Sequence, residues 1–456
     1  MSKKRLIMVF IHTILIILIN IFSGDWSELS KYGMIYLLYS AFTFICLINI
    51  QKNVITPINI LYGSFVLFQT GVPIAFFLKE DYSNYYIKLF SSEIVLNAAK
   101  YTLWSIEAFS LALLFFLNPY NKKKKNIIFS NVKALNSSKH VFSIARIMFV
   151  VTSVVILPLY AYSALLSIRF GFSQEIRSIV ATNSFFNLMR AFFFPSFFLL
   201  ISYEKEHVFT KVSTYIFILV CIFALLSGNR ADGTIWLLTY FYYNKTSEKK
   251  TLVNKLLILL GVFVIVFVAV YIGQNRMGRV SMDFESTLMG LIGEMGFNFL
   301  SICFVMLYVP SARGFLFGTS YIDSIICMIP KSLDFLHLFD SMRNSLPSLW
   351  LYNMNHQRFG ELLDFGTGFS MIGESYMNFS WGGFLMSAVY AFILCKVFNG
   401  QWDDDNKWEK YIQMTVFLGL ITFPRRGFVE FLHIISYSIF FLALILVLTY
   451  RKRSCS

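Results

Sequence analysis

The sequence predicts an all-α polytopic integral membrane protein with about twelve transmembrane helices, or fourteen, and one large outward-facing loop late in the chain. Three observations support this prediction: long apolar runs recur, charged residues are scarce, and lysines cluster between the runs. Hydrophobic residues make up 57% of the 456 residues and charged residues only 14%. Soluble domains carry roughly 45–50% apolar and about 25% charged residues, so a soluble globular fold is excluded.

The apolar runs define the expected helices, because a helix that crosses a bilayer needs roughly 20 mostly apolar residues. The clear runs cover residues 5–23, 33–51, 56–78, 97–118, 141–166, 184–203, 211–228, 231–244, 254–273, 380–398, 410–424 and 429–450. One further apolar stretch spans Thr287–Val309, and a shorter one lies around Tyr321–Pro330. These two stretches fit either a hairpin of two more helices or re-entrant and interfacial pieces, which is why both helix counts stay open.

The first run follows the basic start Met1–Arg5 and lacks a small-residue cleavage site, so we interpret it as a retained helix and not as a signal peptide. Three parts follow along the chain. Residues 1–273 form an N-terminal transmembrane bundle of about nine helices. Residues 274–379 form a large periplasmic or extracellular loop with re-entrant or interfacial helices. Residues 380–456 contain the C-terminal transmembrane helices and a short basic cytoplasmic tail.

The net charge of +14 sets the orientation once it is sorted by position. The densest lysine run, Lys122–Lys125, lies between two apolar stretches, which is typical of a cytoplasmic loop and argues against nucleic-acid binding. With Lys3 and Lys4 in the cytoplasm, every dense lysine cluster falls on the same side. The positive-inside rule therefore predicts cytoplasmic N- and C-termini and an outward-facing segment 274–379.

The arginines have the opposite bias, since 11 of 15 lie outside or at the outer boundary against 5 of 24 lysines. Arginine suits multi-point recognition of phosphate and carboxylate groups. The bias therefore indicates an outward-facing site for an anionic ligand at head-group level. The alternative is that individual arginines reach lipid phosphates or pair with nearby carboxylates. The six cysteines are scattered singly, and this pattern predicts neither a disulfide framework nor a metal site.

A glycine-rich segment, residues 364–384, precedes the tenth clear helix and carries Glu374, Tyr376 and Asn378. Glycines let a backbone approach a ligand closely, and a carboxylate at the mouth of a helix is suited to act as a general base. The structural alternative is a helix cap with glycine pairs that allow tight helix packing. The residues alone leave both interpretations open.

This segment carries a family resemblance. Gly373-Glu-Ser-Tyr-Met-Asn-Phe379 resembles the G-E-x-Y-x-N-F-G stretch of the Wzy-type oligosaccharide repeat-unit polymerases, the O-antigen and capsular polysaccharide polymerases. It departs at Ser380, where a glycine is common. The segments Ser227–Asp232 and Pro424–Gly427 are two further points of similarity, and the plan of many helices with one large late loop also fits.

The resemblance implies a membrane glycosyltransferase on the outer face of the bacterial cytoplasmic (inner) membrane. It would transfer the growing glycan from undecaprenyl diphosphate to a new undecaprenyl-diphosphate-linked repeat unit, in O-antigen (lipopolysaccharide) or capsule biosynthesis. It implies no metal and no cofactor. The implied partners are the lipid-linked oligosaccharides, membrane lipids, and a chain-length regulator and a flippase of the same pathway.

Such a reaction needs cations for the leaving diphosphate and a base for the acceptor hydroxyl. We expect Glu374 to be the base, with His356 as the alternative, although His356 also fits an ordinary loop histidine. Tyr376 and Asn378 are expected at the substrate. The arginines expected to bind the donor diphosphate are Arg230, Arg276 and Arg279, and those expected to hold the second lipid diphosphate are Arg425 and Arg426.

Two other functions stay open at this point. One is an O-antigen ligase-type glycosyltransferase, which would transfer finished glycan to another acceptor. The other is a lipid-linked oligosaccharide flippase or another transporter. Transporters are commonly built from internal repeats with sites near the bilayer midplane. The sequence shows no repeat relating its halves, and its arginines gather at one face, so the polymerase is favoured.

Overall fold

The computed structural model describes residues 3–22, 28–79, 84–118, 139–170, 184–227, 230–245, 284–329, 334, 336, 338–360, 368–398 and 407–453. Helices are the regular elements throughout these residues, and the described part of the chain contains no strand. The expected ninth span, 254–273, lies outside the described residues, as do Arg276 and Arg279.

Eight candidate membrane spans are present among the described residues, judged by helix length and apolar composition. Seven are the long helices α1 (Lys3–Phe22), α2 (Leu29–Gln51), α3 (Pro57–Leu78), α4 (Ser92–Phe116), α5 (Lys139–Phe170), α7 (Ser184–Tyr203) and α8 (Val208–Leu226). The eighth, Met371–Phe398, combines α16 (Met371–Phe379), the 3-10 turn η6 (Ser380–Phe384) and α17 (Leu385–Phe398). These spans confirm the all-α polytopic fold class, and the choice between twelve and fourteen helices stays a prediction.

The remaining helices are shorter, or they belong to the last part of the chain. They are α9 (Arg230–Lys245), α11 (Phe284–Met295), α12 (Asn298–Tyr308), α13 (Thr319–Ile326), α14 (Asp340–Ser345), α15 (Pro347–Phe359), α18 (Lys407–Thr422) and α19 (Phe428–Arg453). Two further 3-10 turns are η2 (Tyr85–Leu89) and η7 (Phe423–Arg425). The last of these connects α18 to α19 through Arg426 and Gly427.

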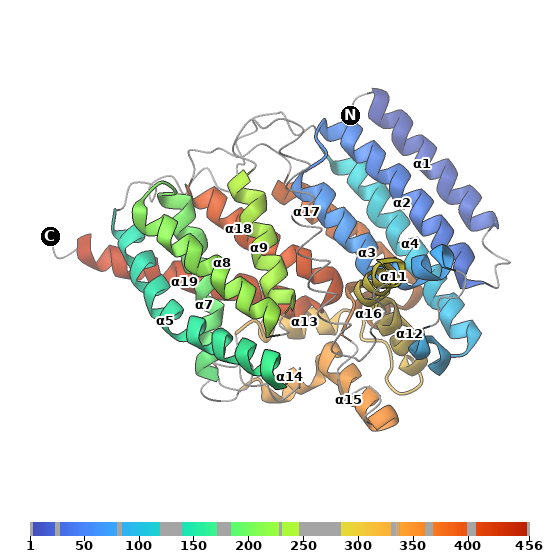
Figure 1. Ribbon diagram of the computed structural model, residues 1–456. Helices are drawn as coiled ribbons and strands as arrows, with labels where there is room; N and C mark the ends of the chain where they lie inside the picture. Colours follow the sequence, from blue (N-terminus) through green and yellow to red (C-terminus); the bar gives the residue numbers. More distant parts are fainter. Residues whose placement is uncertain are drawn as a thin grey trace.

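The helices form two bundles that lie side by side (Figure 1). One bundle contains α1–α4, with α17 packed on α4. The other contains α5, α7, α8 and α9, with α18 and α19 packed on them. Helix α18 also contacts α3, so the C-terminal part of the chain joins the bundles. Helices α12, α13, α14 and α15 lie toward one end of the molecule, away from the start of α1, and α11 lies further in against α3 (Figure 1).

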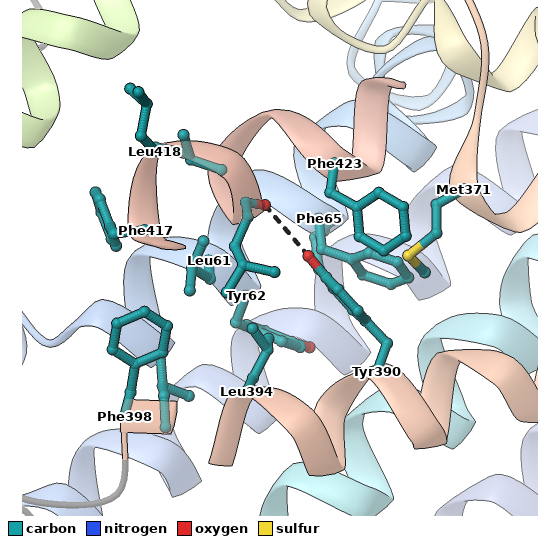
Figure 2. Close-up of a cluster of buried hydrophobic side chains, with 14 of the residues drawn as sticks. Leu61, Tyr62, Phe65, Met371, Tyr390, Leu394, Phe398, Phe417, Leu418 and Phe423 are labelled. Carbon is teal, nitrogen blue, oxygen red and sulfur yellow. Dashed lines mark hydrogen bonds between the residues drawn. The ribbon is translucent and has the colours of Figure 1, made fainter. Parts of the chain in front are cut away.

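The core between the bundles is aromatic and aliphatic (Figure 2). The Tyr390 hydroxyl of α17 donates a hydrogen bond of 3.3 Å to the Leu420 carbonyl of α18, which satisfies a polar group within this core. The buried side chains around it come from α3, α16, α17, α18 and η7: Leu61, Tyr62, Phe65, Met371, Leu394, Phe398, Phe417, Leu418 and Phe423.

The apolar stretch Thr287–Val309 is broken at Gly296 into α11 and α12, which have 12 and 11 residues. At 1.5 Å per residue, neither reaches across the roughly 30 Å hydrocarbon core of a bilayer. Helix α11 packs against α3, and the two segments come close at Gly296 and Gly71. A Cβ atom on Gly296 would lie only 2.3 Å from the Gly71 Cα atom, so this approach requires glycine. The structure therefore has two short helices in this stretch, and the choice between a membrane hairpin and re-entrant or interfacial pieces stays a prediction.

The tenth expected helix starts earlier than residue 380, because α16 already begins at Met371. Ser370 caps it, accepting a hydrogen bond of 3.4 Å from the Gly373 N–H. Ser380 adopts a positive φ of 54° and interrupts the helix. Gly383 then lets η6 fold back against α16, since a Cβ atom there would lie 2.2 Å from the Ser375 carbonyl oxygen.

The start of α1 and the end of α4 lie at the same end of the molecule. The Arg5 side chain donates a hydrogen bond of 2.6 Å from Nε to the Leu114 carbonyl oxygen near the end of α4. The basic N-terminus thus lies beside the point from which α4 leads to Lys122–Lys125. Helices α14 and α15 lie at the opposite end (Figure 1).

Candidate functional site

Glu374, the carboxylate expected to act as a base, is buried, with an exposed fraction of 1%. It lies in the first turn of α16, which packs against α12, α13 and η7. Both carboxylate oxygens accept hydrogen bonds. Oε1 accepts one of 2.9 Å from the Ser320 hydroxyl of α13, and Oε2 accepts one of 2.8 Å from the Phe428 N–H. The Phe428 bond satisfies an N–H at the start of α19, which has no partner within the helix.

Asn378, one turn after Glu374, binds the same segment of α13. Its Nδ2 atom donates to the Ser320 hydroxyl at 2.7 Å and to the Glu374 carbonyl oxygen at 2.8 Å. Its Oδ1 atom accepts from the Gly318 N–H at 2.9 Å. The hydrogen-bonding capacity of this fully buried side chain is therefore used inside the protein. The structure gives Asn378 the role of joining α16 to the start of α13.

Tyr321 strengthens this contact between α13 and α16. Its hydroxyl lies 3.2 Å from the Ser375 hydroxyl, within hydrogen-bond distance. Burial, together with the nearby Glu374 carboxylate, raises the pKa of the Tyr321 hydroxyl, so the side chain stays neutral. The N–H groups of Leu316 and Phe317 also donate to the carbonyls of residues 377 and 378. The segment 316–321 is thus bound to α16 through both backbone and side chains.

A buried amide joins this center to the turn that carries two of the expected arginines. Gln69 of α3 accepts a hydrogen bond of 2.7 Å from the Ser370 hydroxyl through Oε1. Its Nε2 atom donates to the Pro424 carbonyl oxygen at 2.5 Å. Asn298 of α12 donates to the same carbonyl at 3.1 Å. Helices α3, α12 and α16 therefore converge on the turn Pro424–Gly427.

A second carboxylate lies beside Glu374. A Cβ atom on Gly427 would lie 3.3 Å from Glu374 Oε2 and 2.9 Å from Glu430 Oε2. Glycine at position 427 thus allows both carboxylates to approach one point of the turn. Glu430 Oε2 is buried and accepts no hydrogen bond from the described residues. Both oxygens of Glu374, in contrast, accept hydrogen bonds.

The expected arginines divide into three groups. Arg425 and Arg426 lie on the turn beside the carboxylate pair, with Arg425 exposed and Arg426 partly exposed. Arg230 is the first residue of α9 in the other bundle, and its side chain is not among those described. Arg276 and Arg279 lie outside the described residues. The described residues thus bring together Glu374 and the Arg425–Arg426 pair.

The other two expected site residues have different surroundings. Tyr376 belongs to an aromatic cluster, with its ring centroid 5.1 Å from that of Tyr101 and 6.2 Å from that of Trp381. His356 is an exposed residue in the last turn of α15, stacked on Tyr352 at a centroid distance of 6.1 Å. None of the hydrogen bonds that Glu374 makes with described residues involves α15.

Sequence reasoning missed Ser320, Gln69 and Glu430. Gln69 has a visible signal, because it interrupts an otherwise apolar helix, and buried polar residues in membrane helices are costly unless they are partnered. Glu430 likewise interrupts the long apolar run 429–450. Ser320 has no such signal, since a serine in a mixed loop is ordinary. Its role becomes visible only when α13 is seen packed on α16.

The fold and the buried polar center define the class: a polytopic α-helical membrane protein with a carboxylate-containing site where several helices end. The family model of the O-antigen polysaccharide polymerase Wzy matches residues 6–454, nearly the whole chain. The chain therefore belongs to this family, which confirms the resemblance found in the Gly373–Phe379 motif. No curated protein and no solved structure matches the chain.

Family membership and the apolar helices together establish the broad function. The chain is a multi-pass membrane protein of a polymerase family that acts in O-antigen repeat-unit polymerisation, on lipid-linked oligosaccharide repeat units.

Proposed function

We propose that this protein transfers the growing glycan from undecaprenyl diphosphate to a hydroxyl of a new undecaprenyl-diphosphate-linked repeat unit. The reaction takes place on the outer face of the bacterial cytoplasmic membrane, with both termini in the cytoplasm and residues 274–379 outside. The observation that carries this proposal is the pair of the buried Glu374 and the partly exposed Glu430 at the turn that bears Arg425 and Arg426. This turn combines carboxylates that can accept a proton with arginines that can bind a diphosphate.

The chemistry follows from the charges that change. The bond between the anomeric carbon and the diphosphate oxygen breaks, and the negative charge of the leaving diphosphate grows. Fixed guanidinium groups in a partly dehydrated site stabilise that charge. We assign the donor diphosphate to Arg230, Arg276 and Arg279. Arg425 and Arg426 are assigned to the diphosphate of the incoming repeat unit.

The acceptor hydroxyl must lose its proton as its oxygen bonds to the anomeric carbon. We assign this proton to the carboxylate pair Glu374–Glu430. Both oxygens of Glu374 already accept hydrogen bonds, which fix its position. Glu430 Oε2 is the open oxygen beside it. His356 remains the second candidate for the base, and its exposed position on α15 supports it less well.

Tyr376 and Asn378 support the reaction by holding α16. All the described hydrogen bonds of Asn378 go to α13 and α16, and Tyr376 packs among aromatic rings. We therefore assign both residues to positioning Glu374. This proposal replaces their expected contact with substrate.

The proposal is tested with the purified full-length chain in lipid nanodiscs and undecaprenyl-diphosphate-linked repeat units as the only substrate. The expected product is a ladder of longer glycans that remain attached to the lipid. Transfer only to a foreign acceptor would identify a ligase instead. Movement of labelled substrate across proteoliposomes without any new glycosidic bond would identify a flippase. Either result rejects the polymerase assignment.

A further inference from the structure

A pocket of about 410 Å³ lies between the C-terminal end of α12 and helix α15. Its volume falls within the roughly 300–1,000 Å³ range of small-ligand sites. None of the residues assigned to the reaction above lines it. The lining residues are Leu307, Tyr308, Ser311, Ala312, Met354, Gln357 and Arg358.

The two walls of the pocket are held together by contacts beside it. Arg313 donates a hydrogen bond of 3.0 Å to the Ser345 carbonyl oxygen, just before α15 begins. Its guanidinium also lies over the Trp350 ring of α15, 5.3 Å from the ring centroid. Trp350 in turn meets Tyr308 edge-on, with ring centroids 6.2 Å apart. The turn after α12 is thus bound to α15, and the pocket is formed before any ligand arrives.

The lining combines an apolar surface with a few polar groups. Tyr308 is only 3% exposed, and its buried hydroxyl interacts with the Arg358 guanidinium. The Arg358 guanidinium lies 5.8 Å from the Tyr308 ring centroid and forms no salt bridge with a described carboxylate. Gln357 and Ser311 add exposed polar groups at the rim. The buried Tyr308 hydroxyl therefore helps to hold Arg358 at the pocket, where the exposed guanidinium can meet a ligand.

We infer that this pocket binds a sugar residue of the lipid-linked oligosaccharide. A pyranose ring has apolar C–H faces and a rim of hydroxyl groups. Leu307, Ala312 and Met354 supply the apolar surface that such a face needs. Gln357 and Arg358 supply hydrogen-bonding groups for the rim, and Tyr308 holds Arg358 in place. A phosphate group would instead call for several converging cations, and Arg358 is the one cation among the lining residues.

The position of the pocket suits a sugar next to the reacting one. Gly373, adjacent to Glu374, faces Ile302 and Val305 of α12, whose side chains would lie 4.0 and 3.6 Å from a Cβ atom on the glycine. Tyr308 is three residues beyond Val305, or about 4.5 Å further along the helix. The same helix thus contacts the proposed reaction center and lines the pocket. This inference rests on the proposed function and adds a glycan subsite to it.

The test uses Tyr308→Phe, which removes only the hydroxyl, and Arg358→Gln, which removes the charge. Asn353→Ala is the matched control, because Asn353 is an exposed residue of α15 that does not line the pocket. The probe is the repeat-unit oligosaccharide released from its lipid by mild acid. Its binding to the full-length protein in nanodiscs is measured by calorimetry, and chain growth is measured in parallel.

We expect the wild type and Asn353→Ala to bind the oligosaccharide equally. Each pocket variant should bind it about five-fold more weakly, which is the usual effect of losing one hydrogen bond. The inference is overturned if the wild type does not bind the oligosaccharide, if the pocket variants bind it as well as the wild type, or if glycerol phosphate displaces it at equal concentration. The last result would identify a head-group phosphate site.

Failure of the two proposals can be told apart. If the oligosaccharide binds as expected but no lipid-linked chain grows, the polymerase proposal is wrong and the sugar site stands. If chains grow normally in Tyr308→Phe and Arg358→Gln and their oligosaccharide binding is unchanged, the subsite is wrong and the polymerase proposal stands.

Discussion

At the scale of single residues, the hydrogen bonds of Glu374 give it a structural role in holding neighbouring helices together. Its two oxygens accept bonds from Ser320 and Phe428, which belong to different helices. The carboxylate therefore holds α13 and the start of α19 on α16. Glu430 lies beside it with an open oxygen. The sequence motif draws attention to Glu374, while the geometry leaves an oxygen of its neighbour Glu430 without a hydrogen bond from the described residues.

This difference predicts different defects for the two amide variants. Glu374→Gln places an amide opposite the Phe428 N–H or the Ser320 hydroxyl and leaves one buried group unsatisfied. We expect it to lower the free energy of unfolding by about 1–3 kcal/mol. Glu430→Gln should leave thermal stability nearly unchanged and reduce chain growth about 10²–10⁴-fold, as expected for loss of a general base. Thermal unfolding and product ladders measure both effects. Full activity of Glu430→Gln would reject its role.

Asp334 gives a prediction on pH. Burial acts to raise the pKa of the Asp334 carboxyl, but hydrogen bonds from Arg343 and from the N–H groups of Leu338 and Phe339 outweigh it, so the pKa lies below its ordinary value. A carboxylate with a depressed pKa stabilises the fold above its unfolded-state pKa, and this contribution is lost as the pH falls through the lower, folded-state value. The contact with α14 should therefore weaken below about pH 4.

Amide hydrogen exchange in α14 measures this loss. Protection should fall in acid for the wild type and should be low and independent of pH for Asp334→Asn. Asp340→Asn is the matched control, because Asp340 is a longer contact of Arg343, at 3.3 Å, and is itself more exposed. Unchanged protection in Asp334→Asn would contradict the assignment.

At the scale of secondary-structure elements, glycines decide how closely α16 and its neighbours pack. Gly383 has no room for a side chain, since a Cβ atom would lie 2.2 Å from the Ser375 carbonyl oxygen. A Cβ atom on Gly382, in contrast, would have nothing within 4 Å. Two adjacent glycines of one motif thus have different structural roles. Gly383 therefore allows the tight packing that the structural interpretation of this segment expected. The same segment also carries the carboxylate of Glu374.

The pair predicts opposite outcomes for the same substitution. Gly383→Ala forces η6 away from α16, and we expect a loss of about 1–3 kcal/mol in the free energy of unfolding, typical of overpacking, with loss of chain growth. Gly382→Ala should change neither. Thermal unfolding in detergent and the product ladder compare the two variants. Equal stability of both variants would show that η6 can shift freely.

The elements also show how far prediction from the sequence reaches. Hydropathy predicts the long helices well, because burying apolar side chains in lipid depends mainly on composition. It does not predict that α16 begins at Met371 or that α11 and α12 break at Gly296. The cap at Ser370 and the glycine contact with α3 decide those boundaries, and both depend on tertiary packing.

At the scale of the whole molecule, the candidate site is assembled from segments far apart in the sequence. Gln69 meets Ser370 and Pro424, and Ser320 meets Glu374. Sequence motifs identified Glu374 and the Arg425–Arg426 turn separately. Their proximity depends on the packing of α3 and α12 between them, which no local pattern contains. Arg276 and Arg279 lie outside the described residues, so their place in the site remains a prediction.

The orientation of the chain is also a prediction at this scale. Lys3 and Lys4 begin α1, at the end of the molecule opposite to α14 and α15 (Figure 1). We expect Ser341→Cys in α14 to react with a membrane-impermeant maleimide from outside intact cells. Ser247→Cys should react only after the membrane is opened. Five of the six native cysteines are buried, which keeps the background low. The reverse labelling pattern would invert the topology.

The interruption at Ser380 has a consequence for an amphiphilic substrate. Beyond it, α17 carries exposed apolar side chains such as Leu385, Val389 and Ile393. Before it, α16 carries the buried carboxylate. A lipid-linked sugar changes from hydrocarbon to hydroxyls within a similar short distance. One interrupted span can therefore follow both halves of such a molecule, with the break marking the level at which the water-soluble part begins.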